Sequence, residues 1–189
     1  SFVLKNVTIG KQFHWEQQED ERFTGGLKFI IDEGRICAIN TVHIEDYLKS
    51  VISSEMSATS SSELLKAHAV TSRSWLLAQM EKSRLIATTG KKYKTDFSDA
   101  GEIIRWYDRE EHVHYDVCAD DHCQRYHGLT KILSPHAVAA VEATFGQVLM
   151  NGEEICDARY SKCCGGVTEN FENVWEPEHK PYLTPTTDY

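Results

Sequence analysis

The chain has 189 residues, of which 41% are hydrophobic and 26% are charged, and its formal net charge at pH 7 is -9. This length supports one substantial hydrophobic core, in a single domain over residues 1–189 that can divide into two lobes. The composition excludes a disordered chain. The negative charge argues against a nucleic-acid partner, because phosphate binding needs a basic face. No hydrophobic run approaches the length that spans a bilayer.

The first predicted elements are a β-hairpin and a helix. The segment "GGLKFIIDEGRICAINTV" contains two β-rich runs that turn at Glu33-Gly34. A short helix is predicted over Ile44–Ile52, because its apolar residues recur at helical spacing.

A longer helix is predicted from about Ser62 to Lys82, after the serine-rich segment "SATSSS", which offers several N-caps. Its buried stripe consists of Leu65, Ala69, Ser72, Leu76 and Met80.

The second half of the chain mixes strands, loops and one helix. The region from about Ile86 to Gly101 is polar and predicts loops, while the alternation in "HVHYDVC" predicts a strand. The segment "SPHAVAAVEAT" predicts a helix capped by Ser134. In "VLMNGEEICDARYS", Asn151-Gly152 fits a type I′ turn between two strands. This mixture of hairpins and helices predicts an α+β fold.

The six cysteines fall into two groups. Cys37 and Cys156 lie in strand-like apolar contexts, where a buried inert thiol is expected. Cys118, Cys123, Cys163 and Cys164 are clustered, which indicates chemistry rather than a disulfide framework.

Glu55 is a candidate general acid. It follows the first predicted helix, in a break between helices, and breaks are often exposed and functional. Apolar neighbours such as Val51, Ile52 and Met56 desolvate a carboxyl group, which favours its protonated form near neutral pH. The alternative is a solvated or helix-capping glutamate, and spacing alone favours that alternative.

Arg73 lies within the second predicted helix, beside Trp75. An arginine in this place can bind a substrate carboxylate through two parallel hydrogen bonds. An ion pair with an acidic surface residue is equally compatible with the sequence.

The segment "HVHYDVCADDHCQRYHG" is rich in metal-binding side chains. Cys118 and Cys123 have a spacing within the range seen for zinc sites. If the segment before Cys118 is extended, His112 is roughly 20 Å away and cannot share an ion. Either the chain bends between them, or the ligands are Cys118, His122, Cys123 and His127. A disulfide between the two cysteines is the structural alternative, and the histidines favour a metal.

The segment "ARYSKCCGGVTENFENVW" contains a further candidate pair. Tyr160 and Lys162 alternate, so on an extended strand their side chains point the same way. Gly165 and Gly166 permit a turn close to a ligand. An ordinary strand end followed by a glycine turn explains the same pattern.

Three segments in this order resemble the stage II sporulation protein D family (SpoIID/LytB). They are "YLKSVISSEMSATSSSELLKAHAVTSRSW", "YDVCADDHCQRYHG" and "AVEATFGQVLMNGEEICDARYSKCCGGVTENFENVW", which together cover most of residues 43–176. The first is the most specific, with a helix, a glutamate-methionine pair and an arginine-bearing helix. The resemblance implies a SpoIID-like fold of hairpins and helices around a substrate cleft.

The resemblance also implies an activity. Members are lytic transglycosylases that cleave the β-1,4 bond between N-acetylmuramic acid and N-acetylglucosamine in peptidoglycan strands lacking stem peptides, giving 1,6-anhydromuramyl ends. The catalytic acid of the family matches Glu55, and cleft residues match Arg73, Tyr160 and Lys162. Zinc in some members would match His112, Cys118 and Cys123, in a structural role, and the chemistry itself needs no cofactor.

The expected partners are peptidoglycan glycan strands and cell-wall amidases. The chain opens at Ser1 without a methionine or a leader, so we expect a mature or trimmed fragment of an exported protein of the cell envelope, periplasm or extracellular space. Two rival functions remain open, a zinc-dependent hydrolase and a peptidoglycan-binding module that enhances an amidase. The chain departs from the common family pattern where "EMSATSS" lacks a proline after Met56 and where "KCCGG" has cysteines before the glycines.

Overall fold

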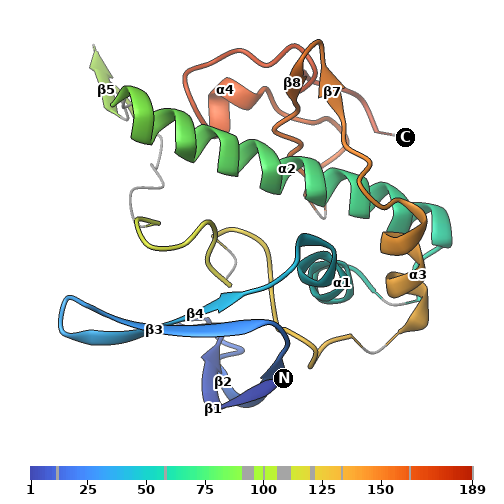
Figure 1. Cartoon of the computed structure of the whole chain (residues 1–189). Helices are drawn as coiled ribbons and strands as arrows, with labels where there is room; N and C mark the ends of the chain where they lie inside the picture. The colour runs from blue at the N-terminus through green and yellow to red at the C-terminus, as the bar shows by residue number, and fades with distance from the viewer. Residues whose placement is uncertain are drawn as a thin grey trace. The chain divides into compact units, whose positions relative to one another are not determined.

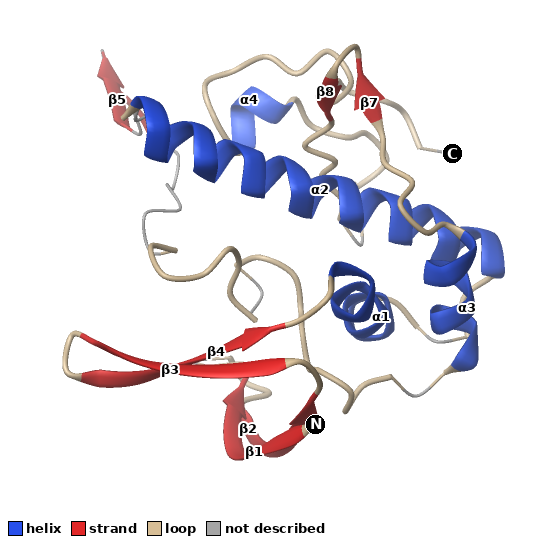
Figure 2. Cartoon of the chain, viewed as in Figure 1, coloured by secondary structure: helices blue, strands red, loops and turns tan. Residues whose placement is uncertain are grey.

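The computed structural model describes residues 1–11, 13–57, 59–90, 96–99, 101–105, 112–119, 122–132, 134–161 and 163–188. The chain forms two compact units, one made of Ser1–Arg73 and Val117–Gln147 and the other of Ser74–Asp116 and Val148–Tyr189. In the described residues the fold is mixed α and β, with four helices and four two-stranded sheets (Figures 1 and 2).

The first unit begins with two antiparallel hairpins. Strands β1 (Phe2–Ile9) and β2 (Gln17–Phe23) pair where the sequence pattern predicted no element. Strands β3 (Gly26–Asp32) and β4 (Arg35–Thr41) form the predicted hairpin. Its turn residues Glu33 and Gly34 both have positive φ, at 47° and 76°, as a type I′ turn requires.

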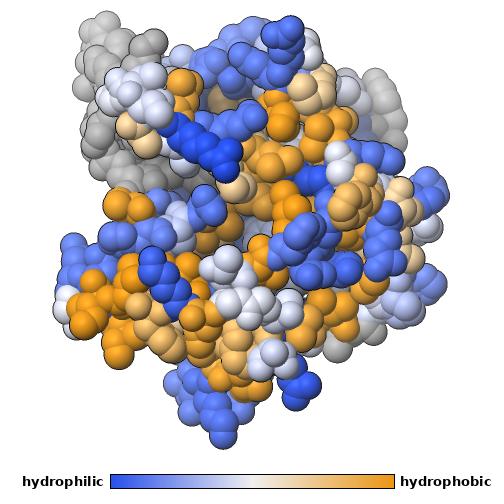
Figure 3. Space-filling view, viewed as in Figure 1, coloured by the Kyte–Doolittle hydropathy of each residue, from blue (hydrophilic) through white to orange (hydrophobic). Residues whose placement is uncertain are grey.

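One side of the β3–β4 hairpin is apolar and faces outward. Phe29 pairs with Ala38 and Ile31 pairs with Ile36 across the two strands. Phe29, Ile31 and Ile36 are 60%, 80% and 76% exposed. Figure 3 shows hydrophobic surface over the outer part of this hairpin.

The predicted helices of the first unit are confirmed. Helix α1 (Ile44–Glu55) includes the predicted span and ends at Glu55, and its residues Tyr47, Leu48, Val51 and Ile52 are buried. Helix α3 (Pro135–Ala143) packs against α1, and its cap is Ser134, whose hydroxyl oxygen accepts a hydrogen bond from His136 N (Figure 1).

Helix α2 (Ser62–Thr89) starts where predicted and ends at Thr89 rather than Lys82. The serine-rich segment provides its cap, because Ser61 Oγ accepts a hydrogen bond from Leu64 N at 3.3 Å. The predicted stripe is buried from Leu65 to Leu76, and Met80 is partly exposed. No helix in the described residues is long and apolar enough to cross a membrane.

Two predictions in the middle of the chain were wrong. The Ile86–Gly101 region is not simply a loop, because α2 continues into it and β5 (Asp96–Asp99) pairs there with β6 (Glu102–Arg105). The segment 112–118 is bent rather than extended. Alternation alone makes a strand only when a neighbouring strand satisfies the backbone.

The C-terminal hairpin is shorter than predicted and turns one residue later. Strands β7 (Met150–Asn151) and β8 (Glu154–Ile155) flank the turn residues Gly152 and Glu153, so a turn at Asn151-Gly152 was wrong. Of these, Gly152 has a positive φ of 61°, which fits the type II′ pattern of glycine at the first central position. The short helix α4 (Phe171–Val174) follows.

Cys37 and Cys156, the two cysteines outside the clustered group, differ in burial. Cys156 is buried, and burial raises the pKa of its thiol, as expected for an inert side chain. Cys37 is only half-buried, on β4 of the two-stranded β3–β4 sheet, so the expectation of a buried thiol was wrong for this residue. None of the six cysteines, all of which the structure describes, forms a disulfide.

Candidate functional site

Glu55 is the last residue of α1, where Met56 takes an extended conformation and the chain leaves the helix. Its side chain is half-buried, and Oε1 accepts a hydrogen bond from the backbone N–H of Arg125 at 3.0 Å. No described residue hydrogen-bonds to Oε2 of Glu55. The main chain of Arg125 therefore holds one oxygen of the Glu55 carboxyl group.

The loop after Glu55 is closed by serine and threonine where a proline is common in the family. Ser57 Oγ lies 2.8 Å from Thr59 Oγ1, and Ser60 N donates to Ser57 O at 3.0 Å. Side-chain hydroxyl groups commonly hold such turns. This is how the chain fixes the exit from α1 without proline.

A short segment with alternating burial, Gln124–Gly128, holds the Arg125 N–H against Glu55. Gln124 is 1% exposed, accepts a hydrogen bond from Tyr47 and donates to Ser72 O. The sequence did not identify Gln124 as a site residue, although the alternation in "QRYHG" was a signal for it.

The neighbours of Arg125 on its C-terminal side are also anchored. Tyr126 donates to Asn40 Oδ1 at 2.6 Å, and His127 N donates to Ser50 Oγ at 3.0 Å. Burial first, and then the carboxylates of Asp46 and Glu21, raise the pKa of Tyr126 to about 12, so its hydroxyl keeps the proton that it donates.

His127 does not lie with the cysteines, because its Nδ1 is 2.5 Å from Glu21 Oε1. The alternative ligand set that contained His127 is therefore not the one that the structure assembles.

Arg73 is buried and paired inside the first unit. It is 1% exposed, and its Nε and Nη2 donate to the two carboxylate oxygens of Glu45 at 2.9 and 2.7 Å. Its Nη1 donates to Gln147 O at 2.9 Å. Glu45 is itself buried, whereas the ion-pair alternative assumed an acidic surface residue. Direct contact with a substrate carboxylate would require Arg73 to release Glu45.

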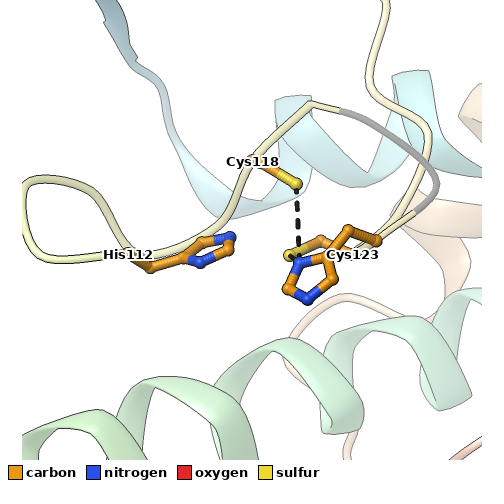
Figure 4. Close-up of side chains that lie close together, drawn as sticks. His112, Cys118 and Cys123 are labelled. Carbon is orange, nitrogen blue, oxygen red and sulfur yellow. Dashed lines mark hydrogen bonds between the residues drawn. The ribbon is translucent and has the colours of Figure 1, made fainter. Parts of the chain in front are cut away.

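Four potential metal ligands converge in the bent segment, namely His112, Cys118, His122 and Cys123. One ligand atom of each lies within 4.8 Å of the others. Figure 4 shows the His112 imidazole directed toward the two sulfur atoms. His122 Nδ1 is 4.0 Å from Cys118 Sγ and 3.7 Å from Cys123 Sγ.

This donor set fits zinc. Zinc–ligand bonds of about 2.0–2.3 Å in a tetrahedron separate the ligand atoms by about 3.3–3.8 Å, close to these distances. Two cysteines and two histidines are a common set for structural zinc. The group therefore combines the two alternatives from the sequence. It contains His112, which requires a bent chain, and it also contains His122 from the other ligand set.

The remaining candidates belong to the second unit. Tyr160 is half-buried on irregular chain, so the prediction of a strand at Tyr160 was wrong. Lys162, the other member of the predicted pair, lies outside the described residues. Gly165 and Gly166 both have positive φ, at 73° and 103°, as a glycine turn requires. Cys163 is exposed, and Cys164 Sγ lies 3.6 Å from Asp188 Oδ2.

Comparison with known proteins gives two findings. An uncharacterized protein of Brachyspira hyodysenteriae is 26% identical over 153 residues, which are 81% of this chain and 34% of that relative. The chain thus spans about a third of the length of this relative. The model of the SpoIID family, stage II sporulation protein, matches residues 32–151, which include Glu55, Arg73 and the cysteine-histidine segment. This chain belongs to the SpoIID family of stage II sporulation proteins.

Proposed function

We propose that this protein is a peptidoglycan lytic transglycosylase with Glu55 as its single acid/base. Membership of the SpoIID family is consistent with a sporulation-related role in cell-wall lysis. The observation that carries the proposal is the carboxyl group of Glu55, held at one oxygen by Arg125 N at 3.0 Å and half-buried at a helix end within the matched region.

The reaction needs one carboxyl group rather than two. Neutral Glu55 gives its proton to the glycosidic oxygen as the bond from C1 of the muramyl residue to that oxygen breaks. The muramyl C6 hydroxyl oxygen then forms the new bond to C1, and the Glu55 carboxylate takes the hydroxyl proton. Glycosidases that use water need a second carboxyl group, whereas an internal hydroxyl is already close to C1.

Substrate binding is proposed to involve Tyr160, Lys162 and Arg73. Tyr160 and Lys162 are proposed to contact the glycan, as the resemblance to the family implies. Arg73 is proposed to act from inside the protein, because its guanidinium is occupied by Glu45 and Gln147. The expected partners are glycan strands without stem peptides, and amidases that remove those peptides. A role on these partners would fit a location in the cell envelope or outside the cell.

We further propose that His112, Cys118, His122 and Cys123 hold a structural zinc ion. When bound, the ion would cross-link the segment and supply no acid, base or nucleophile. A set of four protein ligands leaves no open position for water, which argues against a zinc hydrolase. The segment continues directly into Arg125, so fixing it also fixes the N–H that binds Glu55.

The test is Glu55→Gln, assayed by mass spectrometry of products from peptide-free glycan strands. General acid catalysis contributes about 100- to 10,000-fold, so anhydromuramyl products should fall by at least about 100-fold. Glycan binding should persist, because the amide keeps an oxygen that accepts the Arg125 N–H.

The matched control is Glu142→Gln, on the exposed face of α3, which should keep full activity. Undiminished anhydro product from Glu55→Gln would disprove the mechanism. Glycan binding without any product from the wild-type protein would instead favour the amidase-enhancing module.

A further inference from the structure

The turn between β1 and β2 presents two stacked aromatic rings. Phe13 N donates to Gly10 O at 2.9 Å, and Glu16 N donates to Phe13 O at 3.0 Å, so the turn is internally bonded. The rings of Phe13 and Trp15 stack with centroids 5.6 Å apart and planes 16° apart. Phe13 is 53% exposed, which leaves much of its ring open to solvent.

Trp15 is fixed in place by two contacts. Gly10 has a φ of 63°, and a Cβ at this position would lie 2.2 Å from the indole ring, so glycine permits the close approach of Trp15. The guanidinium carbon of Arg125 lies 4.9 Å from the centroid of the indole, within the range of a cation–π contact.

Arg125 connects this stack to the candidate catalytic acid. Its backbone N–H binds Glu55 Oε1 at 3.0 Å while its side chain lies on Trp15. One residue therefore positions the acid with its main chain and extends a cationic, aromatic surface away from it. All four residues belong to the first unit.

We propose that Phe13, Trp15 and Arg125 form a glycan-binding subsite that adjoins Glu55. In this subsite Arg125 pairs with a lactyl carboxylate of a denuded muramyl residue, and the open ring of Phe13 stacks on the C–H face of a neighbouring sugar. The inference rests on the proposed function, because it takes the glycan strand as the substrate.

The chemistry of the two partners is complementary. A strand without stem peptides carries one carboxylate on each muramyl residue, and a planar guanidinium binds carboxylates through parallel hydrogen bonds. The protein has a net charge of -9, so binding such a strand requires a local cation near the acid. Arg73 is enclosed by Glu45 and Gln147, whereas Arg125 is half-exposed.

The experiment compares two ligands of the same backbone, peptide-free muramyl-glucosaminyl oligosaccharides and chitin oligosaccharides of equal length, which lack the lactyl carboxylate. Affinities are measured by titration calorimetry in the Glu55→Gln background, where the strand is not cleaved. Arg125→Gln should weaken binding of the muramyl ligand by about tenfold and leave the chitin ligand unchanged. This substitution keeps the backbone N–H that binds Glu55.

A second set of variants tests the aromatic part of the subsite. Phe13→Leu keeps apolar volume but loses the ring, and it should weaken both ligands by about fivefold. The controls are Phe145→Ala, a ring 67% exposed after α3, and Arg35→Gln on β4, an exposed cation; neither should change either affinity.

Equal effects of Arg125→Gln on both ligands would overturn the carboxylate pairing. Unchanged binding of both ligands by Phe13→Leu would overturn the stacking. These affinities are measured without cleavage and are therefore independent of the reaction. Failure of the wild-type protein to form anhydro ends would disprove the proposed transglycosylase activity and not the subsite.

Discussion

Arg73 has the largest of the fully buried side chains in the described residues, and Glu45 balances its charge inside the protein. The sequence marked Arg73 as important but could not show which way its side chain points. A buried charge needs a partner, and Glu45 is 28 positions away, so only folding could reveal the pair.

We predict that Arg73→Met destabilises the protein by about 3–5 kcal/mol, because Glu45 is left buried without a counter-ion. Urea unfolding measures the loss. The double variant Arg73→Met with Glu45→Met should recover much of it, since both charges are then absent. An unchanged free energy of unfolding in the single variant would contradict this positioning role and favour direct contact with substrate.

At the scale of elements, α1, α2, α3 and the β3–β4 hairpin followed from local patterns. Apolar residues at helical spacing, a serine cap before a helix and a two-residue turn are short-range signals, and the structure confirms each of them. The end of α2 and the position of the β7–β8 turn were not predicted correctly. Local sequence has only a weak preference for the residue at which an element ends.

The buried face of α2 makes stability depend on pH through His68. This residue is 4% exposed, and burial lowers its pKa from 6.5 to about 4. Between these two pH values His68 is protonated in the unfolded chain and neutral in the folded chain. Stability is therefore complete above about pH 6.5 and falls by about 3 kcal/mol as the pH drops toward 4.

Urea unfolding at about pH 7.5 and about pH 5 measures this effect, which should reach about 2 kcal/mol over that interval. His68→Gln removes the titrating group and should reduce the difference by that amount. His136→Gln, at an exposed position of α3, should keep the full difference. Equal pH dependence in all three proteins would exclude His68 as the cause.

At the scale of the whole molecule, the structure brings together His112, Cys118, His122 and Cys123, which the linear pattern divided between two alternative ligand sets. We predict that Cys118→Ser lowers both zinc content and melting temperature, because a structural ion contributes directly to folding. Elemental analysis and thermal unfolding measure the two effects. Cys37→Ser, outside the ligand group, is the control and should leave zinc content unchanged.

A chelator should reduce activity only as fast as the fold loosens, which circular dichroism can follow in parallel. Loss of activity before any loss of structure would support a catalytic metal instead. Wild-type protein without zinc would remove the proposal of a metal site.

The sequence by itself determined the family, the mixed α and β composition, the positions of α1 and α3, the start of α2 and the candidate acid Glu55. These features depend on residues that lie close together in the chain. Only the tertiary structure decided what surrounds Glu55 and Arg73. Arg125 reaches Glu55 across 70 positions and Glu45 reaches Arg73 across 28. Such contacts depend on packing between distant segments, and no local pattern of charge or spacing specifies them.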